Sequence, residues 1–162
     1  GFDCVIRTGA LPEDGVIARP LGKLTMVNCA SPHYLTRFGY PQSPDDLTSH
    51  AIVRYTPHLG VHPLGFEVAS VNGVQWFKSG GMLTVNSSEN YLAAGLAGLG
   101  IIQIPRIAVR EALRAGRLIE VLPGYRAEPL SLSLVYPQRR ELSRRVNLFM
   151  QWLAGVMKEY LD

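Results

Sequence analysis

The segment that most constrains the fold is TVNSSENYLAAGLAGLGIIQIP, residues 84–105, in which two extended apolar runs enclose a helix of small residues. Ser87 or Ser88 is in the position of the N-cap, and Glu89 lies in the first helical turn. The helix ends at glycines, and the apolar strand 101–104 follows at once. Small residues allow a helix backbone to approach a sheet closely. The segment therefore predicts a buried strand–helix–strand unit of an α/β fold.

The turn before this helix is also a candidate ligand site. Backbone N–H groups at the start of a helix lack intrahelical partners and carry a partial positive charge, and here they follow the carboxyl end of a strand. In open α/β sheets ligands bind at that edge, so Asn86, Ser87 and Ser88 indicate a site for a small polar or anionic molecule. Ordinary helix capping explains the same residues, and spacing alone leaves both interpretations open.

Capping and turn residues place most of the other elements. Ser31 and Gly39 are in the N-cap and terminator positions of a short helix, and Ser43 starts another with Asp46 three residues on. The Asn-Gly pair at 72–73 predicts a hairpin between the apolar runs that flank it. Further strands are predicted at 1–7, 23–30, 51–55 and 82–86. Strands separated by helices predict a parallel or mixed sheet that is covered on both faces.

The last segment predicts an amphipathic helix whose apolar stripe must be covered by other parts of the protein. The stripe consists of Leu142, Val146, Phe149, Met150, Leu153, Val156, Met157 and Tyr160. The densest basic cluster lies at its start and consists of Arg139, Arg140, Arg144 and Arg145. The solvated start of a helix explains these arginines better than nucleic-acid binding does.

Composition indicates an ordinary globular chain, since 47% of its 162 residues are hydrophobic and 18% are charged. No apolar run reaches the about 20 residues that cross a bilayer, and no secretory signal begins the chain, so a cytoplasmic location is expected. Cys4 and Cys29 lie in apolar runs, where a reduced thiol behaves as a small hydrophobe. His58 and His62 lie among Pro and Gly residues that exclude a helix, which favours a loop over a metal site.

Three long segments carry an informative combination of motifs. They are DCVIRTGALPEDGVIARPLGKLTMVNCASPHYLTRFGYPQSPDDLTSH, NSSENYLAAGLAGLGIIQIPRIAVREALRAGRLIEVLP and LSLVYPQRRELSRRVNLFMQWL. They contain an ASP-x-YL turn, a G-LGI-x2-P strand exit, a G-x-L-x-x-VLP segment and a closing S-x-R-V-x2-F helix. In this combination and order they resemble the effector-binding domain of LysR-type transcriptional regulators. The resemblance implies a type II periplasmic-binding-protein-like α/β fold, with two lobes and a ligand cleft between them.

The resemblance also implies how the chain is divided. Residues 1–30 correspond to the end of lobe I, residues 31–137 to lobe II, and residues 138–162 to a C-terminal helix that returns to lobe I. Members of the family carry a winged helix-turn-helix, a dimerisation helix and the first part of lobe I ahead of the point that corresponds to Gly1. We therefore expect that the N-terminus of the natural protein is missing here.

Partners and site residues follow from the same resemblance. The implied partners are a small effector, identical subunits in a homodimer or homotetramer, DNA through the N-terminal domain, and RNA polymerase; no cofactor, metal or membrane is implied. The effector is expected to contact Arg7, Thr8, Gly9, Asn86, Ser87, Ser88, Ile104 and Pro105. A second interpretation of Arg7 is a structural ion pair with Asp3 or Glu13.

Two functions from different classes agree with the sequence. The first is an effector-sensing regulatory domain without catalytic activity. Ser87 and Ser88 lie in no G-x-S-x-G elbow, and nothing marks any of the four histidines as their base. The alternative is a solute-binding protein or a small enzyme on the same α/β scaffold, since a fold does not determine a function.

Overall fold

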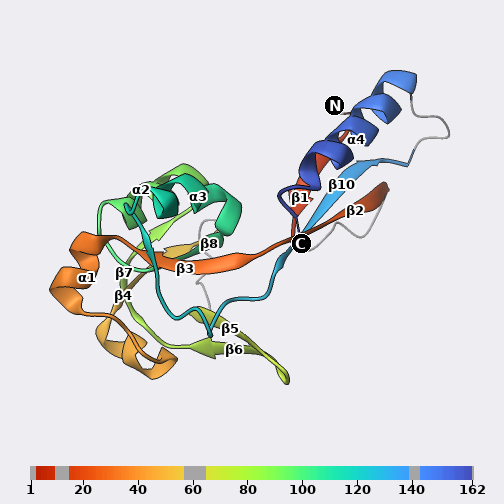
Figure 1. Cartoon of the computed structure of the whole chain (residues 1–162). Coiled ribbons are helices and arrows are strands. Elements are labelled where there is room, and N and C mark those ends of the chain that lie inside the picture. Colours follow the sequence, from red (N-terminus) through yellow and green to blue (C-terminus); the bar gives the residue numbers. More distant parts are fainter. Residues whose placement is uncertain (1–2, 10–14, 57–64, 139–142, 162) are drawn as a thin grey trace. The chain divides into compact units, whose positions relative to one another are not determined.

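The computed structural model describes residues 3–9, 15–56, 65–138 and 143–161, and the chain forms two compact units (Figure 1). One unit combines residues 1–25 with residues 129–162, and the other consists of residues 26–128. The sequence had suggested boundaries after residues 30 and 137. The units of the structure have other boundaries than these. The strand that begins at residue 26 pairs inside the second unit, whereas the strand that ends at residue 137 pairs inside the first.

The first unit is a three-stranded antiparallel sheet with one helix. Its strands are β1 (Val5–Thr8), β2 (Val16–Leu24) and β10 (Leu130–Pro137), in the order β1-β10-β2. Helix α4 (Arg144–Met157) follows its N-cap Ser143 and packs Met150 and Leu153 against Leu134 of β10. The predicted stripe is only partly covered within this unit, since Phe149 remains 47% exposed.

The second unit is built around a mixed sheet, as expected. Strands β3 (Met26–Ala30), β8 (Ile102–Pro105) and β9 (Ile119–Glu120) pair antiparallel in the order β8-β3-β9. Strand β4 (Ala51–Tyr55) pairs in parallel with β7 (Gly80–Val85). A parallel bridge between Ile52 and Ile101 joins these two groups of strands.

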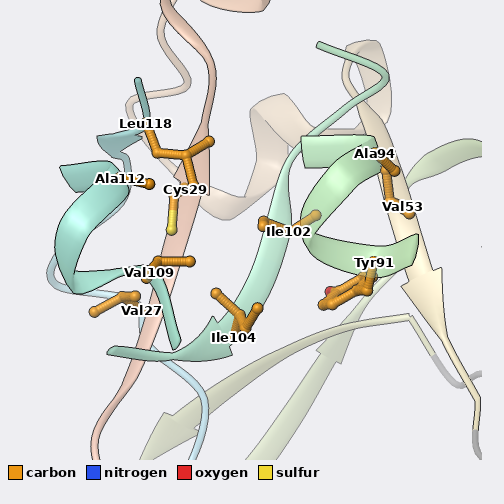
Figure 2. Close-up of a cluster of buried hydrophobic side chains, with 10 residues drawn as sticks. All are labelled: Val27, Cys29, Val53, Tyr91, Ala94, Ile102, Ile104, Val109, Ala112 and Leu118. Carbon is orange, nitrogen blue, oxygen red and sulfur yellow. The ribbon is translucent and has the colours of Figure 1, made fainter. Parts of the chain in front are cut away.

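Helices α2 (Ser88–Leu96) and α3 (Arg106–Arg114) pack on one face of this sheet and enclose the core drawn in Figure 2. That core consists of Val27, Cys29, Val53, Tyr91, Ala94, Ile102, Ile104, Val109, Ala112 and Leu118. A Cβ atom at Gly95 of α2 would lie 2.6 Å from Ile102 Cδ1. This close approach confirms that the small residues of α2 let it pack tightly on the sheet.

The other face is covered by α1 (Pro32–Phe38), the 3-10 helix η1 (Pro44–Ser49) and the hairpin of β5 (Phe66–Ser70) with β6 (Gly73–Phe77). The predicted caps are present. Ser31 Oγ accepts a hydrogen bond from the Tyr34 N–H at 3.2 Å, and the Asp46 carboxylate accepts one from the Ser43 N–H at 3.0 Å. Local sequence therefore fixes both helix starts.

Candidate functional site

The carboxyl ends of β4, β7 and β8 lie along one edge of the second unit. Tyr55 pairs with Val85, and the Thr56 N–H donates to the Val85 carbonyl at 2.9 Å. The start of β8 runs parallel to β4 at the bridge between Ile52 and Ile101. Because ligands of open α/β sheets bind beyond this kind of edge, a ligand site is expected there.

The N-terminus of α2 lies at this edge, directly after β7. Asn86, Ser87 and Ser88 form this end of the helix, which is called the head of α2 below. Ser87 is the N-cap, and its Oγ accepts a hydrogen bond from the Asn90 N–H at 3.3 Å. Ser88 is the first residue of the helix. Asn86 and Ser88 are exposed, and Ser87 is half-buried. The capping expected from the sequence is confirmed, and polar groups at the helix start are accessible.

A carboxylate from the helix itself already lies at this head. The Ser87 hydroxyl donates to Glu89 Oε2 at 2.6 Å, and the Ser88 hydroxyl donates to the same oxygen at 3.4 Å. The hydrogen bond from Ser87 is the main reason why the pKa of Glu89 lies below its usual value. The sequence had suggested that both hydroxyls were available to a ligand. An anionic ligand would instead have to replace the Glu89 carboxylate.

The two residues expected at the exit of β8 have different environments. The Ile104 side chain is only 4% exposed and belongs to the core in Figure 2. Pro105 is half-buried, pairs with Met26 and precedes the first residue of α3. The Ile104 side chain therefore packs inside the unit and does not line an open surface, which leaves Pro105 as the accessible residue of this pair.

The remaining predicted residues lie in the first unit, at the end of β1: Arg7, Thr8 and Gly9. All three are exposed. Gly9 has a φ of 77°, a backbone conformation that favours glycine, and its N–H donates to the Ser131 carbonyl at 3.0 Å. Within the described ranges Arg7 makes no ion pair, either with Asp3 or with another residue. Glu13 lies outside the described residues.

The second unit also contains a pocket that the sequence did not predict. Its volume is about 250 Å³. The lining residues that matter for its chemistry are Arg54, Tyr55, Glu67, Trp76, Tyr91 and Gln103. They come from β4, β5, β6, α2 and β8, which are far apart in the sequence. The signal that could have indicated it is the arginine within the apolar strand AIVRY.

Gln103 connects the walls of this pocket. Its side-chain Oε1 accepts from the Glu67 N–H at 2.9 Å, and its Nε2 donates to the Glu67 carbonyl at 2.8 Å and to Asn28 Oδ1 at 3.0 Å. Its backbone N–H donates to the Tyr91 hydroxyl at 2.8 Å. Burial raises the pKa of Tyr91 to about 12, so this hydroxyl stays neutral near pH 7. Gln103 thus holds β5 to β8 through its side-chain amide.

The other reactive groups in the described residues lie in structural surroundings. Cys29 is fully buried, and burial raises the pKa of its thiol to about 12, so it is an inert core residue. In the described part of the chain no three His, Cys, Asp or Glu side chains gather as metal ligands. His58, His62, Arg139 and Arg140 lie outside the described residues. None of the described helices has the length and apolar character that a membrane span requires.

Comparisons of the sequence with known proteins agree with one another. The family model of the LysR substrate binding domain matches residues 1–158. The HTH-type transcriptional regulator YhjC of Escherichia coli (strain K12) is 99% identical over all of this chain, which corresponds to 54% of that protein. The HTH-type transcriptional repressor PA14_22550 of Pseudomonas aeruginosa (strain UCBPP-PA14) is 34% identical, over 98% of this chain and 50% of that protein. The chain thus spans about half the length of the curated relatives it matches.

The structure leads to the same family. The regulatory domain of CrgA, a LysR-type transcriptional regulator from Neisseria meningitidis, superimposes with a TM-score of 0.81 at 26% identity, over 95% of this chain and 74% of that one. This likeness confirms the expected type II periplasmic-binding-protein-like α/β fold. The chain therefore belongs to the LysR substrate binding domain family, the effector-binding regulatory domains of LysR-type transcriptional regulators.

Proposed function

We propose that this domain binds a small anionic or polar effector in the cleft between two lobes. Residues 26–128 would form lobe II, and the other unit would belong to lobe I. The observation that carries the proposal is the head of α2, where Ser87 and Ser88 present hydroxyls at the carboxyl edge of β4 and β7. Relatives named as transcriptional regulators support a sensing function without catalysis.

Glu89 supports an anionic group at this position. Its carboxylate accepts hydrogen bonds from both serine hydroxyls, so an effector carboxylate of similar shape could take its place. Thr8 and Arg7 would meet the effector from lobe I. Charge-assisted hydrogen bonds are roughly twice as strong as neutral ones. An effector that forms them only in a closed cleft would shift the population of the domain towards that state.

The full-length protein would convert this shift into a change in DNA binding. We infer that it acts in the cytoplasm as a homodimer or homotetramer, which binds DNA through a winged helix-turn-helix and contacts RNA polymerase. The support is that relatives of about twice this length are named HTH-type regulators. A change in the angle between lobes would alter the spacing of the DNA-binding domains across the oligomer.

Replacing both Ser87 and Ser88 by Gly in the full-length regulator tests the effector site. Gly is tolerated at the N-cap position of Ser87, and Gly at Ser88, the first helical residue, should cost at most about 1 kcal/mol, so the fold should be kept while both hydroxyls disappear. We expect the effector concentration for half-maximal induction to rise about tenfold or more, because hydrogen bonds to a charged group are lost. The measurement is expression from a target-promoter reporter, under the growth condition that induces the parent.

The substitution Glu89→Gln serves as the matched control. It keeps the helix start intact but removes the negative charge that competes with an anionic effector. We expect this variant to respond at a lower effector concentration than the parent. If the double glycine variant responds as the parent does, the two serines only cap the helix, and the proposed site is wrong.

A second test concerns DNA. Residues 1–162 alone should give no footprint at a defined operator at physiological salt, because the proposed DNA-reading domain lies in the part of the relatives that this chain does not span. A net charge of +3 should give only weak attraction to DNA that disappears as salt increases. The full-length regulator is the positive control. A sequence-specific footprint from residues 1–162 would contradict the proposal that DNA binding belongs to a separate domain.

A further inference from the structure

The pocket beside Gln103 is lined by other residues than those expected to contact the effector. All of its lining residues belong to the unit of residues 26–128. Its volume of about 250 Å³ is slightly below the range of drug-sized ligand pockets, so it suits a molecule with few heavy atoms. The charges and rings on its walls indicate the chemical class of that molecule.

Arg54 brings a positive charge to this pocket that is poorly satisfied. Its Nη2 donates to the Ser79 carbonyl at 3.0 Å, but within the described residues Arg54 Nε and Ser79 Oγ are buried without hydrogen-bond partners. The side chain lies over Gly81, where a Cβ atom would be 3.5 Å from Nε. Among the same residues Arg54 has no ion-pair partner. A carboxylate is the natural acceptor for the unused guanidinium donors.

Glu67 brings a negative charge to the same pocket. Its Oε1 accepts a hydrogen bond from the Glu128 N–H at 3.0 Å, and its backbone is held by Gln103. It forms no ion pair with Arg54 or with any other residue in the described part of the chain. The walls therefore carry one positive and one negative charge that form no direct ion pair with each other. A plain carboxylate would be repelled by Glu67, and a plain amine would be repelled by Arg54.

Two exposed aromatic side chains supply the apolar part of the pocket: Tyr55, which is 44% exposed, and Trp76, which is 46% exposed. The buried Tyr91 ring packs behind Tyr55, with ring centroids 5.7 Å apart, and holds that ring in place. Such rings give a ligand apolar contact area, and their faces also attract a cationic group. The lining thus combines a cation that can bind a carboxylate, an anion that can bind an ammonium group, and an apolar surface.

We propose that this pocket binds a free amino acid. Arg54 receives the carboxylate, Glu67 receives the ammonium group, and an apolar side chain packs on the aromatic rings. The zwitterion satisfies both unpaired charges at once, which neither an acid nor an amine of the same size does. This assignment goes beyond the proposed effector contacts at the start of α2, because it names a ligand class for a different set of residues inside one unit.

The test uses the full-length regulator and isothermal titration with each standard L-amino acid at millimolar concentration. At least one amino acid with an apolar side chain should bind. Its deaminated and decarboxylated analogues should each bind about tenfold or more weakly, because each leaves one charge of the pocket unpaired. If no amino acid binds, or if the analogues bind as tightly, the proposal is overturned.

Two variants assign the binding to these residues. Arg54→Met removes the guanidinium and should weaken binding of the amino acid about tenfold or more. Glu67→Gln keeps an acceptor for the Glu128 N–H, and should make the amino acid and its deaminated analogue bind alike. Arg114→Met and Glu111→Gln are matched controls, since these residues form an exposed ion pair of 3.2 Å on α3, away from the pocket lining. Both controls should bind as the parent does.

The variant with glycine at positions 87 and 88 separates this site from the head of α2. It should retain the affinity of the parent for the amino acid, because neither serine lines the pocket. Loss of amino-acid binding in that variant, together with unchanged binding in Arg54→Met, would place the ligand at the head of α2. That result would overturn the second site while supporting the proposed effector site.

Discussion

Replacing Asn28 by Ala is expected to lower the free energy of unfolding by about 3 kcal/mol or more. Asn28 is fully buried, and its Nδ2 donates to the carbonyls of Leu122 at 3.2 Å and Tyr125 at 2.9 Å. Its Oδ1 accepts from Gln103 Nε2 at 3.0 Å. The substitution removes these three hydrogen bonds and leaves a cavity, although Gln103 Nε2 keeps the Glu67 carbonyl and the Leu122 carbonyl keeps the Tyr125 N–H. It also releases the turn in which Leu122 has a φ of 48°, a backbone conformation that is costly for a residue other than glycine.

Urea unfolding of the variant and the parent measures this effect. Asn90→Ala is the matched control, because the Asn90 side chain is exposed and the hydrogen bond in the helix cap uses its backbone N–H. We expect a change within about 0.5 kcal/mol for that control. Equal midpoints for the Asn28 and Asn90 variants would mean that the buried network contributes nothing net to stability.

The elements that the sequence predicted best are those in which neighbouring residues satisfy the backbone. Ser31 and Ser87 each cap the helix that follows, and Gly39 ends α1 with a φ of 82°. The Asn-Gly pair at 72–73 lies between β5 and β6, which pair as predicted. In each case the partner of the polar group lies within a few residues, so spacing along the chain was sufficient information.

Strand β2 shows where local reasoning failed. The predicted strand began at Lys23, whereas β2 extends from Val16 to Leu24 and a separate strand starts at Met26. Pro20 and Gly22 discourage a strand prediction, because Pro lacks a backbone donor and Gly lacks a side chain to pack. In the sheet β2 lies at an edge, and the register shifts at this point, since Leu132 pairs with Gly22 and Ser133 pairs with Pro20. An edge strand with a bulge tolerates both residues.

Of the two candidate sites, one depends on neighbouring residues and was predictable, and the other depends on distant contacts and was not. The polar head of α2 was predictable, because a cap and its helix are adjacent in sequence. The capture of both serine hydroxyls by Glu89 was not, because it depends on side-chain rotamers. The pocket depends on contacts such as that of Gln103 with Asn28, which lie 75 residues apart, and a single sequence contains no record of such pairings.

The substitution Gly100→Ala is expected to be at least as destabilising, by about 3 kcal/mol or more. A Cβ atom at Gly100 would lie 2.6 Å from the Ala51 carbonyl oxygen and 3.2 Å from the Val53 nitrogen. These are backbone atoms of β4, and both take part in the hydrogen bonds that join β4 to Ile101. The strands must therefore separate to admit the methyl group. The φ of 156° adds strain for any residue with a side chain.

Two other glycines separate the steric effect from the effect of φ. Gly116 has a φ of 66° but no atom within 4 Å of an added Cβ, so Gly116→Ala should cost only about 1 kcal/mol. Gly124 has open space and no left-handed φ, so Gly124→Ala should change stability by less than about 1 kcal/mol. In thermal and urea unfolding the loss of stability should be largest for the Gly100 variant, smaller for the Gly116 variant and smallest for the Gly124 variant. If Gly100→Ala unfolds like Gly116→Ala, then β4 and the start of β8 can separate without penalty. In that case the edge that carries Arg54 and Gln103 is less rigid than a preformed ligand pocket requires.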